Sequence, residues 1–172
     1  MRRVHDARFA TRYFVGHGID IGCGNDPLND QREHFPLIES CLPWDIVDGD
    51  AQKMEMDAGV QFDFIYSSHC LEHLHSPLVA LRRWCDLLRA GGHLVIVVPD
   101  HTLYEHDNWP SKYNPDHKWS FTTARCADLM RSLAGMRILK LELLDHTFKP
   151  KDIGDQTLGN AECGIELILQ KD

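Results

Sequence analysis

The stretch GIDIGCG, residues 18–24, decides how this chain folds. An apolar run that passes through Asp20 into Gly22 and Gly24 is typical of a strand that ends in a tight turn, where glycine lets the backbone approach a ligand closely. The carboxylate of Asp20 ends this strand and needs a partner, because burying an unpaired charge is costly. Ligands of open α/β sheets bind at the carboxyl ends of the strands. We therefore predict a ligand-binding turn here.

Strand and helix signals alternate along the rest of the chain, which predicts an α/β fold with a mainly parallel sheet. Helices are expected at 3–14, from Ser76-Pro77 to Gly91-Gly92, and from a cap at Thr122 or Thr123 to Gly135. Strands are expected at Ile65 and Tyr66, over the unbroken apolar run 93–99, and at 139–143 and 165–169, where alternation is typical of half-exposed strands.

Size, charge and cysteine content limit the kinds of function. The 172 residues suit a single domain, 1–172, and the 43% of apolar residues suffice for a buried core. A formal net charge of −8 repels phosphate backbones, so we expect no nucleic-acid partner. No apolar run is long enough for a membrane span or a signal peptide, and six scattered cysteines indicate free thiols in a reducing compartment. We therefore expect a cytoplasmic protein with no membrane partner.

Two nucleotide-based cofactors compete for the turn at 20–24. A dinucleotide fold needs a third glycine three positions after the second, for close helix packing and pyrophosphate binding, and Pro27 stands at that position. An acid at the end of the first strand fits the cationic amino group of S-adenosylmethionine better than it fits a pyrophosphate. The residues themselves leave open a third possibility, a glycine turn that serves only to reverse the chain.

Three segments resemble class I S-adenosylmethionine-dependent methyltransferases of the small bacterial type. Residues 18–24 resemble the family's first motif, residues 62–73 (FDFIYSSHCLEH) its fourth-strand region, and residues 87–94 (LLRAGGHL) the turn into its fifth strand. They occur in the family's order and cover about half of the chain. The resemblance implies a Rossmann-like methyltransferase fold with a mainly parallel sheet and an antiparallel C-terminal strand.

The same resemblance implies which residues hold S-adenosylmethionine. They are Asp20, Gly22, Cys23 and Gly24 in the turn, then Asp45, Asp50 and Ala51, then Ser67 and Ser68. Gly49-Asp50-Ala51 resembles the third motif, whose acid meets the adenine amino group, and Asp45 is the acid that would accept bonds from both ribose hydroxyls. Asp45 and Asp50 lie so close that the first half of the fold is abbreviated. Asp48 competes with Asp45 for the ribose.

Histidines are numerous, and His69, His73 and His75 follow the fourth-strand region. His69 and His73 are four positions apart and could share one helix face, a spacing that metal sites use. No HExxH arrangement is present and the spacing supplies no third ligand, so the sequence predicts no metal site. Leu71-Glu72-His73 is interpreted as structural, shaping the turn under the cofactor.

The segment 109–120 follows the fifth strand, on the side of the sheet where such folds bind substrates. Trp109, Tyr113 and Trp119 could supply flat apolar faces for a ring, or could pack on the core instead. A hydroxyl acceptor also requires a base, and a histidine suits because its pKa lies near the working pH. His117 and His69 are the candidates for this catalytic role.

The sequence thus predicts an enzyme that transfers a methyl group from S-adenosylmethionine to a small-molecule or glycan acceptor, at oxygen. Two alternatives remain at this point. One is a methyltransferase-like binding module without activity, and the other is a nicotinamide oxidoreductase. Pro27 in the place of the third glycine disfavours the oxidoreductase, and the intact Asp20 turn disfavours the inactive module.

Overall fold

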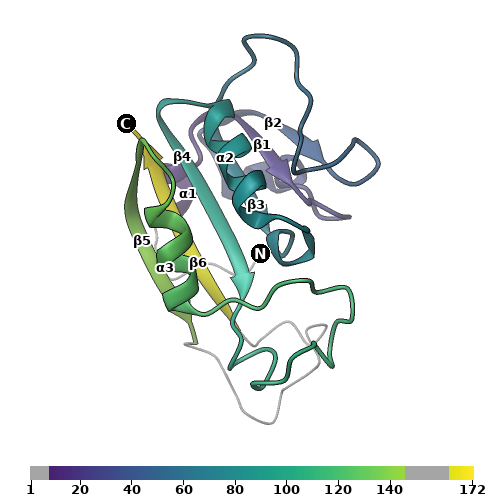
Figure 1. The fold of residues 1–172 in the computed structure, drawn as a ribbon. Helices are drawn as coiled ribbons and strands as arrows, with labels where there is room; N and C mark the ends of the chain where they lie inside the picture. The colour runs from purple at the N-terminus through teal and green to yellow at the C-terminus, as the bar shows by residue number, and fades with distance from the viewer. Residues whose placement is uncertain (1–7, 146–162) are drawn as a thin grey trace.

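The fold is a single six-stranded sheet with helices on both faces, and the computed structural model describes residues 8–145 and 163–172 (Figure 1). In chain order the elements are α1 (Phe9–Tyr13), β1 (Gly16–Ile21), the 3-10 helix η1 (Leu28–His34), β2 (Ile38–Trp44), β3 (Phe62–Ser68), the 3-10 helix η2 (Leu71–His73), α2 (Pro77–Leu87), β4 (Leu88–Pro99), α3 (Thr123–Arg131), β5 (Met136–Leu144) and β6 (Gly164–Lys171).

The strand order β2-β1-β3-β4-β6-β5 confirms the Rossmann-like α/β class. The pairs β1–β2, β1–β3 and β3–β4 are parallel, while β6 runs antiparallel to both β4 and β5. The order reverses at β1, which lies between β2 and β3. Such a switch point is where open α/β sheets bind their ligands, just beyond the carboxyl ends of the strands.

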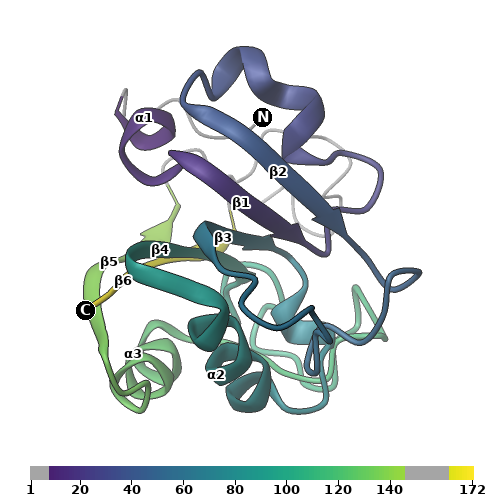
Figure 2. The same cartoon turned by 90° about the horizontal axis from the view of Figure 1, so that it is seen from above.

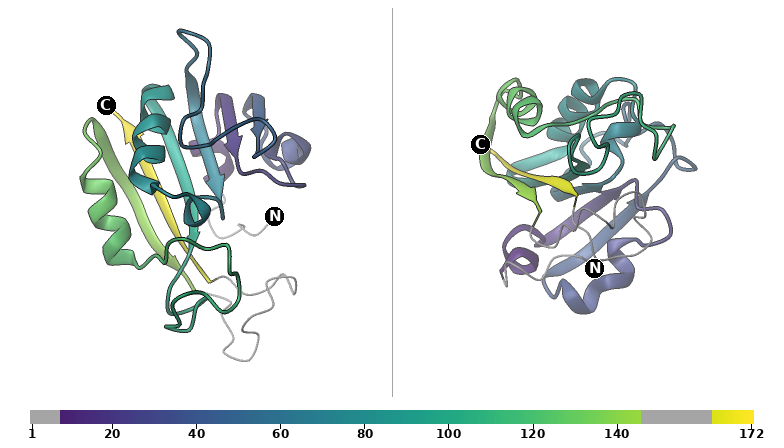
Figure 3. Two further views of the ribbon diagram at one scale, coloured as in Figure 1. Left: turned by 45° about the vertical axis from the view of Figure 1, so that its right-hand side comes forward. Right: turned by 90° about the horizontal axis from the view of Figure 1, so that it is seen from below.

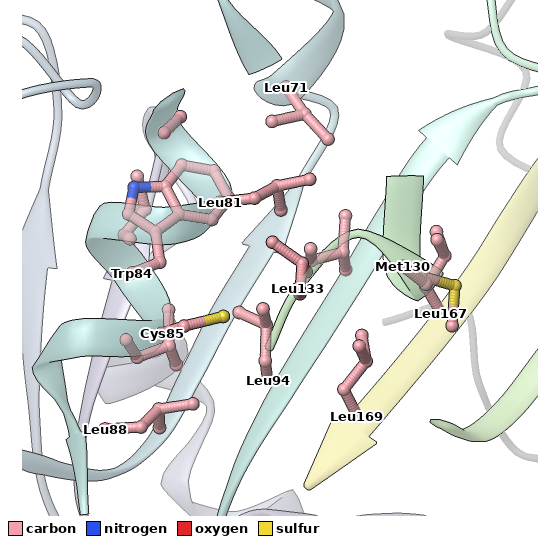
Figure 4. Close-up of a cluster of buried hydrophobic side chains, with 14 of the residues drawn as sticks. Leu71, Leu81, Trp84, Cys85, Leu88, Leu94, Met130, Leu133, Leu167 and Leu169 are labelled. Carbon is pink, nitrogen blue, oxygen red and sulfur yellow. The ribbon is translucent and has the colours of Figure 1, made fainter. Parts of the chain in front are cut away.

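Two apolar clusters cover the two faces of the sheet. Helices α2 and α3 lie on one face, and α1 and η1 lie on the other (Figure 2). On the first face Trp84 and Leu81 of α2 and Met130 of α3 meet strand residues such as Leu94 and Leu167 (Figure 4). This two-sided burial explains why the central strand β4 reads as an unbroken apolar run.

The first half of the fold is abbreviated, as expected. The connection from β1 to β2 is only the short η1, and the segment 45–61 contains neither a strand nor a helix. Consequently the strand at Phe62–Ser68, which resembles the family's fourth, is the third strand of this sheet. The brevity of the segment also keeps Asp45 and Asp50 within one short run of turns.

Helix α2 differs from its predicted form at both ends. Pro77 occupies the first turn as expected, but the Ser76 side chain makes no capping hydrogen bond. The helix ends at Leu87, and the chain passes directly into β4, so Gly91-Gly92 lie inside the strand and not at a helix terminus. A Cβ on Gly92 would lie 2.9 Å from the Arg89 carbonyl oxygen, so close packing within the strand explains this glycine.

The last strand is more buried than its alternation predicts. Residues 164–169 of β6 are all buried, because β6 lies between β4 and β5 and both of its faces are covered. Glu166 tolerates this position by accepting a hydrogen bond of 2.9 Å from the Lys140 ammonium group. By contrast, β5 is the half-exposed edge strand that was expected.

The remaining expectations concern the helices and the thiols. Thr122 caps α3 by accepting a hydrogen bond from the Arg125 backbone N–H, as predicted. Of the leading helix only Phe9–Tyr13 is helical, and residues 3–7 of that prediction lie outside the described residues. None of the six cysteines forms a disulfide. Within 8–145 and 163–172, no helix combines the length and the apolar character that a membrane span requires.

Candidate cofactor and catalytic site

The turn after β1 approaches the chain that follows β3 very closely. Gly22 and Gly24 have φ values of +75° and +55°, a region that residues with a Cβ rarely adopt. A Cβ on Gly22 would lie 2.5 Å from the Cβ of Cys70, so only glycine fits there. The Gly22 N–H also donates to the Trp44 carbonyl, which fixes the turn against the end of β2.

Asp20 lies buried at the end of β1 and accepts a 2.8 Å hydrogen bond from the Leu28 N–H. Burial raises the pKa of Asp20 from 3.8 to about 6; the Leu28 hydrogen bond opposes this rise, and the negative charges of Asp26 and Asp45 add to it. When burial and neighbouring acids raise the pKa of a carboxyl group, a cationic ligand stabilises its ionised form. The environment of Asp20 therefore fits a group that carries positive charge.

Asp45 connects the end of β2 to the glycine turn. Its Oδ2 atom accepts from the Gly24 N–H at 2.6 Å, and its Oδ1 atom accepts from the Ile46 N–H at 2.6 Å. Asp48 instead turns back, because its Oδ2 atom accepts from the Asp45 N–H at 2.8 Å. Asp45 therefore lies beside the turn at 20–24, whereas Asp48 stabilises the backbone of its own loop after β2.

Asp50 and Ala51 belong to a segment that is anchored to α2. The Ala51 carbonyl accepts from the Trp84 indole N–H at 2.9 Å, and Gln52 accepts from the Ser76 N–H. The Gln52 backbone N–H donates to Asp50, which lowers the pKa of that exposed carboxyl. Asp50 is therefore an ionised acceptor at the same edge of the sheet.

Ile46 and Val47 were not singled out from the sequence. Their side chains are 87% and 89% exposed, immediately after β2 and next to Asp45. Two apolar side chains in open water within an acidic turn are unusual for a structural role. Two apolar residues inside the acidic run WDIVDGD, residues 44–50, are the sequence feature that could have indicated a ligand contact here.

Ser67 and Ser68 end β3, and of the two only Ser68 is partly exposed. The next residue, His69, has φ +55°, and its N–H donates to the Val97 carbonyl at 2.9 Å. Burial, and then the charges of Glu72, Asp45 and Asp20, raise the pKa of the Cys70 thiol to about 12. Cys70 thus lies near both the acids of the turn at 20–24 and the acid of a second cluster that follows β3.

The second cluster surrounds Glu72, whose side chain is fully buried. One imidazole nitrogen each from His69, His73 and His117 lies 3.5, 4.0 and 3.9 Å from the Glu72 Oε1 atom. His69 and His73 do not share a helix face, because His69 precedes the short η2 with a left-handed backbone. The sequence predicts only a structural role for Glu72. Glu72 and His117 are far apart along the chain, so the sequence does not show that their side chains meet.

His117 reaches this cluster because its loop is fastened to η2. The N–H groups of Lys118 and Trp119 both donate to the Glu72 carbonyl, at 2.8 and 3.1 Å, and the Lys118 ammonium donates to the His73 carbonyl. Figure 3 shows this loop beyond the carboxyl ends of the strands, next to η2. Glu105, on the same loop, lies 2.6 Å from His117 Nδ1 and is itself buried.

The three aromatic side chains of the loop are partly exposed. Trp109, Tyr113 and Trp119 are 45%, 38% and 37% accessible, so none of them is a core residue. The Trp119 indole N–H donates to the His75 carbonyl, which fixes this ring beside η2. The loop therefore presents flat apolar surface at the edge that also carries the glycine turn and the histidines.

Several solved structures with this architecture are described as methyltransferases. An S-adenosylmethionine-dependent methyltransferase from Mesorhizobium loti superposes with a TM-score of 0.64 at 16% identity, covering 96% of this chain and 95% of its own. The plantazolicin methyltransferase BpumL, solved in complex with SAH, gives 0.63 at 15%, with 96% and 79% covered. The mitomycin 7-O-methyltransferase MmcR gives 0.61 at 13%, with 96% of this chain and 52% of that chain covered. The fold is thus that of a Rossmann-like methyltransferase.

Residues 5–140 match the protein family described as a methyltransferase domain, and the chain belongs to this family. It is an S-adenosylmethionine-dependent methyltransferase. A search of curated proteins found no significant match. Of the interpretations that the sequence left open, membership excludes the nicotinamide oxidoreductase.

The residues of the turn fit this cofactor. S-adenosylmethionine carries a cationic amino group, and the buried Asp20 is the carboxylate whose surroundings call for a cation. At Gly24 no atom lies within 4 Å of the position that a Cβ would take, so a ligand can approach the backbone closely there.

The pH dependence of binding tests Asp20. In the wild-type protein, affinity for S-adenosylmethionine should rise between about pH 5 and pH 7, because Asp20 loses its proton through about pH 6. Asp20→Asn keeps an oxygen for the Leu28 N–H but should bind at least tenfold more weakly at about pH 7 and lose this rise. Isothermal titration at several pH values measures both quantities.

Thermal unfolding of the free protein supplies the control for folding. A folded-state pKa above 3.8 means that the stability contributed by Asp20 is complete below that pH and is lost as the pH rises through about 6. Asp20→Asn should therefore melt higher than wild type above about pH 6 and equally near pH 4. Unchanged cofactor affinity in this variant would show that Asp20 makes no cofactor contact.

Proposed function

We propose that this enzyme methylates a hydroxyl oxygen of a small-molecule or glycan acceptor. The observation that carries the proposal is the anchored loop 100–121, which brings exposed aromatic side chains and imidazoles to the edge that holds the glycine turn. Aromatic faces suit a ring-shaped acceptor, and imidazoles suit the removal of a hydroxyl proton. The net charge of −8 disfavours a nucleic-acid acceptor.

The cofactor would lie across the carboxyl ends of β1, β2 and β3. Asp20 would face its amino group, and the turn Gly22-Cys23-Gly24 would approach its methionine part. Asp45 would accept bonds from the ribose hydroxyls, because it already lies against the turn. The adenine would meet Asp50, Ala51 and the exposed Ile46 side chain, whose apolar surface it would cover. Ser68 is the accessible serine at the end of β3.

Methyl transfer needs an oxygen held in line with the carbon–sulfur bond and a group that takes its proton. When bound, S-adenosylmethionine supplies the electrophilic methyl group. The protein aligns the acceptor through its loop and takes the hydroxyl proton on an imidazole nitrogen. The side chain of His69 is 35% exposed, whereas that of His117 is 3% exposed, so His69 is the more accessible base.

Two further observations support parts of this proposal. A structural neighbour is an O-methyltransferase by name, which agrees with transfer to oxygen. Six cysteines without a disulfide agree with a reducing compartment, and we propose the cytoplasm as the location.

Thermal shift tests the choice of cofactor. S-adenosylmethionine and S-adenosylhomocysteine at about 100 times Kd should each stabilise the fold by about 2.7 kcal/mol, a rise in Tm of roughly 5–10 °C. NAD should give no rise. Asp20→Ala should abolish the response to both ligands while leaving a folded protein. A rise with NAD and none with S-adenosylhomocysteine would sink the cofactor assignment.

Turnover separates the two candidate bases. With a panel of hydroxylated acceptors and release of S-adenosylhomocysteine as the readout, loss of the base should lower turnover by roughly 10²–10⁴-fold and remove the acidic limb of the pH–rate profile. We expect this of His69→Ala. His117→Ala is the alternative, and His75→Asn is the control because His75 is exposed and outside the cluster. A pH–rate profile unchanged in both alanine variants would exclude His69 and His117 as the base.

A further inference from the structure

Glu72 is a buried carboxylate without a hydrogen-bond partner. Its side chain is fully buried, and within residues 8–145 and 163–172 neither carboxylate oxygen makes a hydrogen bond. Three imidazole nitrogens lie 3.5–4.0 Å from its Oε1 atom, beyond the usual hydrogen-bond distance. An unpaired buried carboxylate costs several kcal/mol, so proteins retain one where a cation or another charged partner meets it.

The surroundings of Glu72 have the composition of a metal site. One oxygen of Glu72 and one nitrogen each of His73 and His117 all lie within 4.8 Å of one another. Metal bonds of about 2.0–2.1 Å in tetrahedral geometry require ligand atoms about 3.3 Å apart. The separations from Glu72 to the two rings are 4.0 and 3.9 Å and all three atoms lie within 4.8 Å, so side-chain rotation would have to draw the ligands together around an ion.

His117 is oriented as metal-bound histidines usually are. Its Nδ1 atom lies 2.6 Å from the buried carboxylate of Glu105, and its Nε2 atom faces Glu72. A neutral ring that donates from Nδ1 to Glu105 carries its lone pair on Nε2, directed at Glu72. A second carboxylate behind a ligating imidazole fixes the tautomer and raises the basicity of the ligand.

We propose that Glu72, His73 and His117 bind a divalent transition-metal ion, with Glu105 as the residue that positions His117. Two imidazoles and one carboxylate suit Zn²⁺ or Fe²⁺ and leave coordination positions open for a substrate, whereas Mg²⁺ prefers oxygen ligands. His69 is the nearest further imidazole and lies 3.5 Å from Glu72. This arrangement makes His117 a ligand and leaves His69 free to accept a proton.

The chemistry of the site rests on the proposed function. An acceptor hydroxyl that coordinates the ion has a lowered pKa and loses its proton, to His69 or to water. Its oxygen then forms a bond to the methyl carbon as the carbon–sulfur bond breaks, and the electron pair stays on sulfur. The products are the methyl ether, S-adenosylhomocysteine and one proton. Cys70, which contacts Gly22 and lies beside Glu72, places the site next to the cofactor turn.

A network of ion pairs without metal is the competing account. In it, a doubly protonated His117 bridges Glu72 and Glu105. The two accounts predict opposite changes in the stability of the metal-free protein when Glu72 is replaced by a neutral amide. In the metal-site account the replacement removes an unpaired buried charge and does not destabilise the fold. In the ion-pair account it breaks a buried ion pair and destabilises the fold.

Direct metal binding is the first test. Protein freed of metal with a chelator is titrated with Zn²⁺ by calorimetry and with Co²⁺ by visible absorption, without cofactor or acceptor. One ion of each kind should bind per chain. His73→Asn and His117→Asn should weaken binding by at least about 100-fold, and Glu105→Gln by about 10–100-fold. His75→Asn, two positions from His73, is the matched control and should bind as wild type does.

Thermal unfolding is the second test. Zn²⁺ should raise the Tm of wild type and not that of Glu72→Gln, while metal-free Glu72→Gln should melt as high as metal-free wild type or higher. Absence of binding tighter than about 100 μM in wild type, or a lowered Tm in metal-free Glu72→Gln, would overturn the proposal. The proposed function is tested independently of the metal, because binding of S-adenosylmethionine is measured in the presence of chelator. Its failure can therefore be distinguished from failure of the metal site.

Discussion

The close approach of the Gly22 backbone to Cys70 brings the two halves of the site together. The turn after β1 and the chain after β3 meet where a Cβ would lie 2.5 Å from a neighbouring side chain, so both segments are held at one edge of the sheet. The charges of Asp20, Asp45 and Glu72 all act on the Cys70 thiol, so the three acids lie around this contact. The proposed cofactor and acceptor sites would therefore be neighbours, held together by a contact between backbone and side chain.

This arrangement concentrates negative charge where it is least favourable for folding. Asp20, Glu72 and Glu105 are all buried at the same edge, and burial is the largest of the effects that raise the pKa of Asp20. Such groups oppose folding until a ligand of opposite charge arrives. A cationic cofactor would compensate the buried negative charge of Asp20, and a bound metal ion would compensate that of Glu72. The free enzyme is therefore expected to be less stable than its liganded form, which is common at functional sites.

The parts of the fold that sequence patterns predicted are those set by local chemistry. The turn at 20–24, the N-terminal cap at Thr122 and the apolar run of β4 each follow from neighbouring residues. Long-range packing decided the rest. Alternation in β6 suggested a half-exposed strand, because nothing nearby shows that Glu166 finds Lys140 on the adjacent strand.

The same distinction holds at the candidate site. Asp20 and Asp45 stand at strand ends, so their positions at one edge could be predicted from the parallel sheet. The meeting of Glu72 with His117 could not, because it depends on backbone hydrogen bonds from Lys118 and Trp119. Main-chain hydrogen bonds of this kind do not depend on side-chain identity, so the sequence does not indicate them.

Those two backbone bonds also bear on how the enzyme can change its substrate. The loop is fastened to η2 through main-chain N–H groups, which every residue except proline supplies. The exposed Trp109 side chain takes no part in that attachment and can be exchanged while His117 keeps its place, whereas Tyr113 packs on Tyr104, whose ring packs on His117. New acceptors could therefore arise in evolution by substitutions in the outer part of the loop, with the catalytic geometry inherited unchanged.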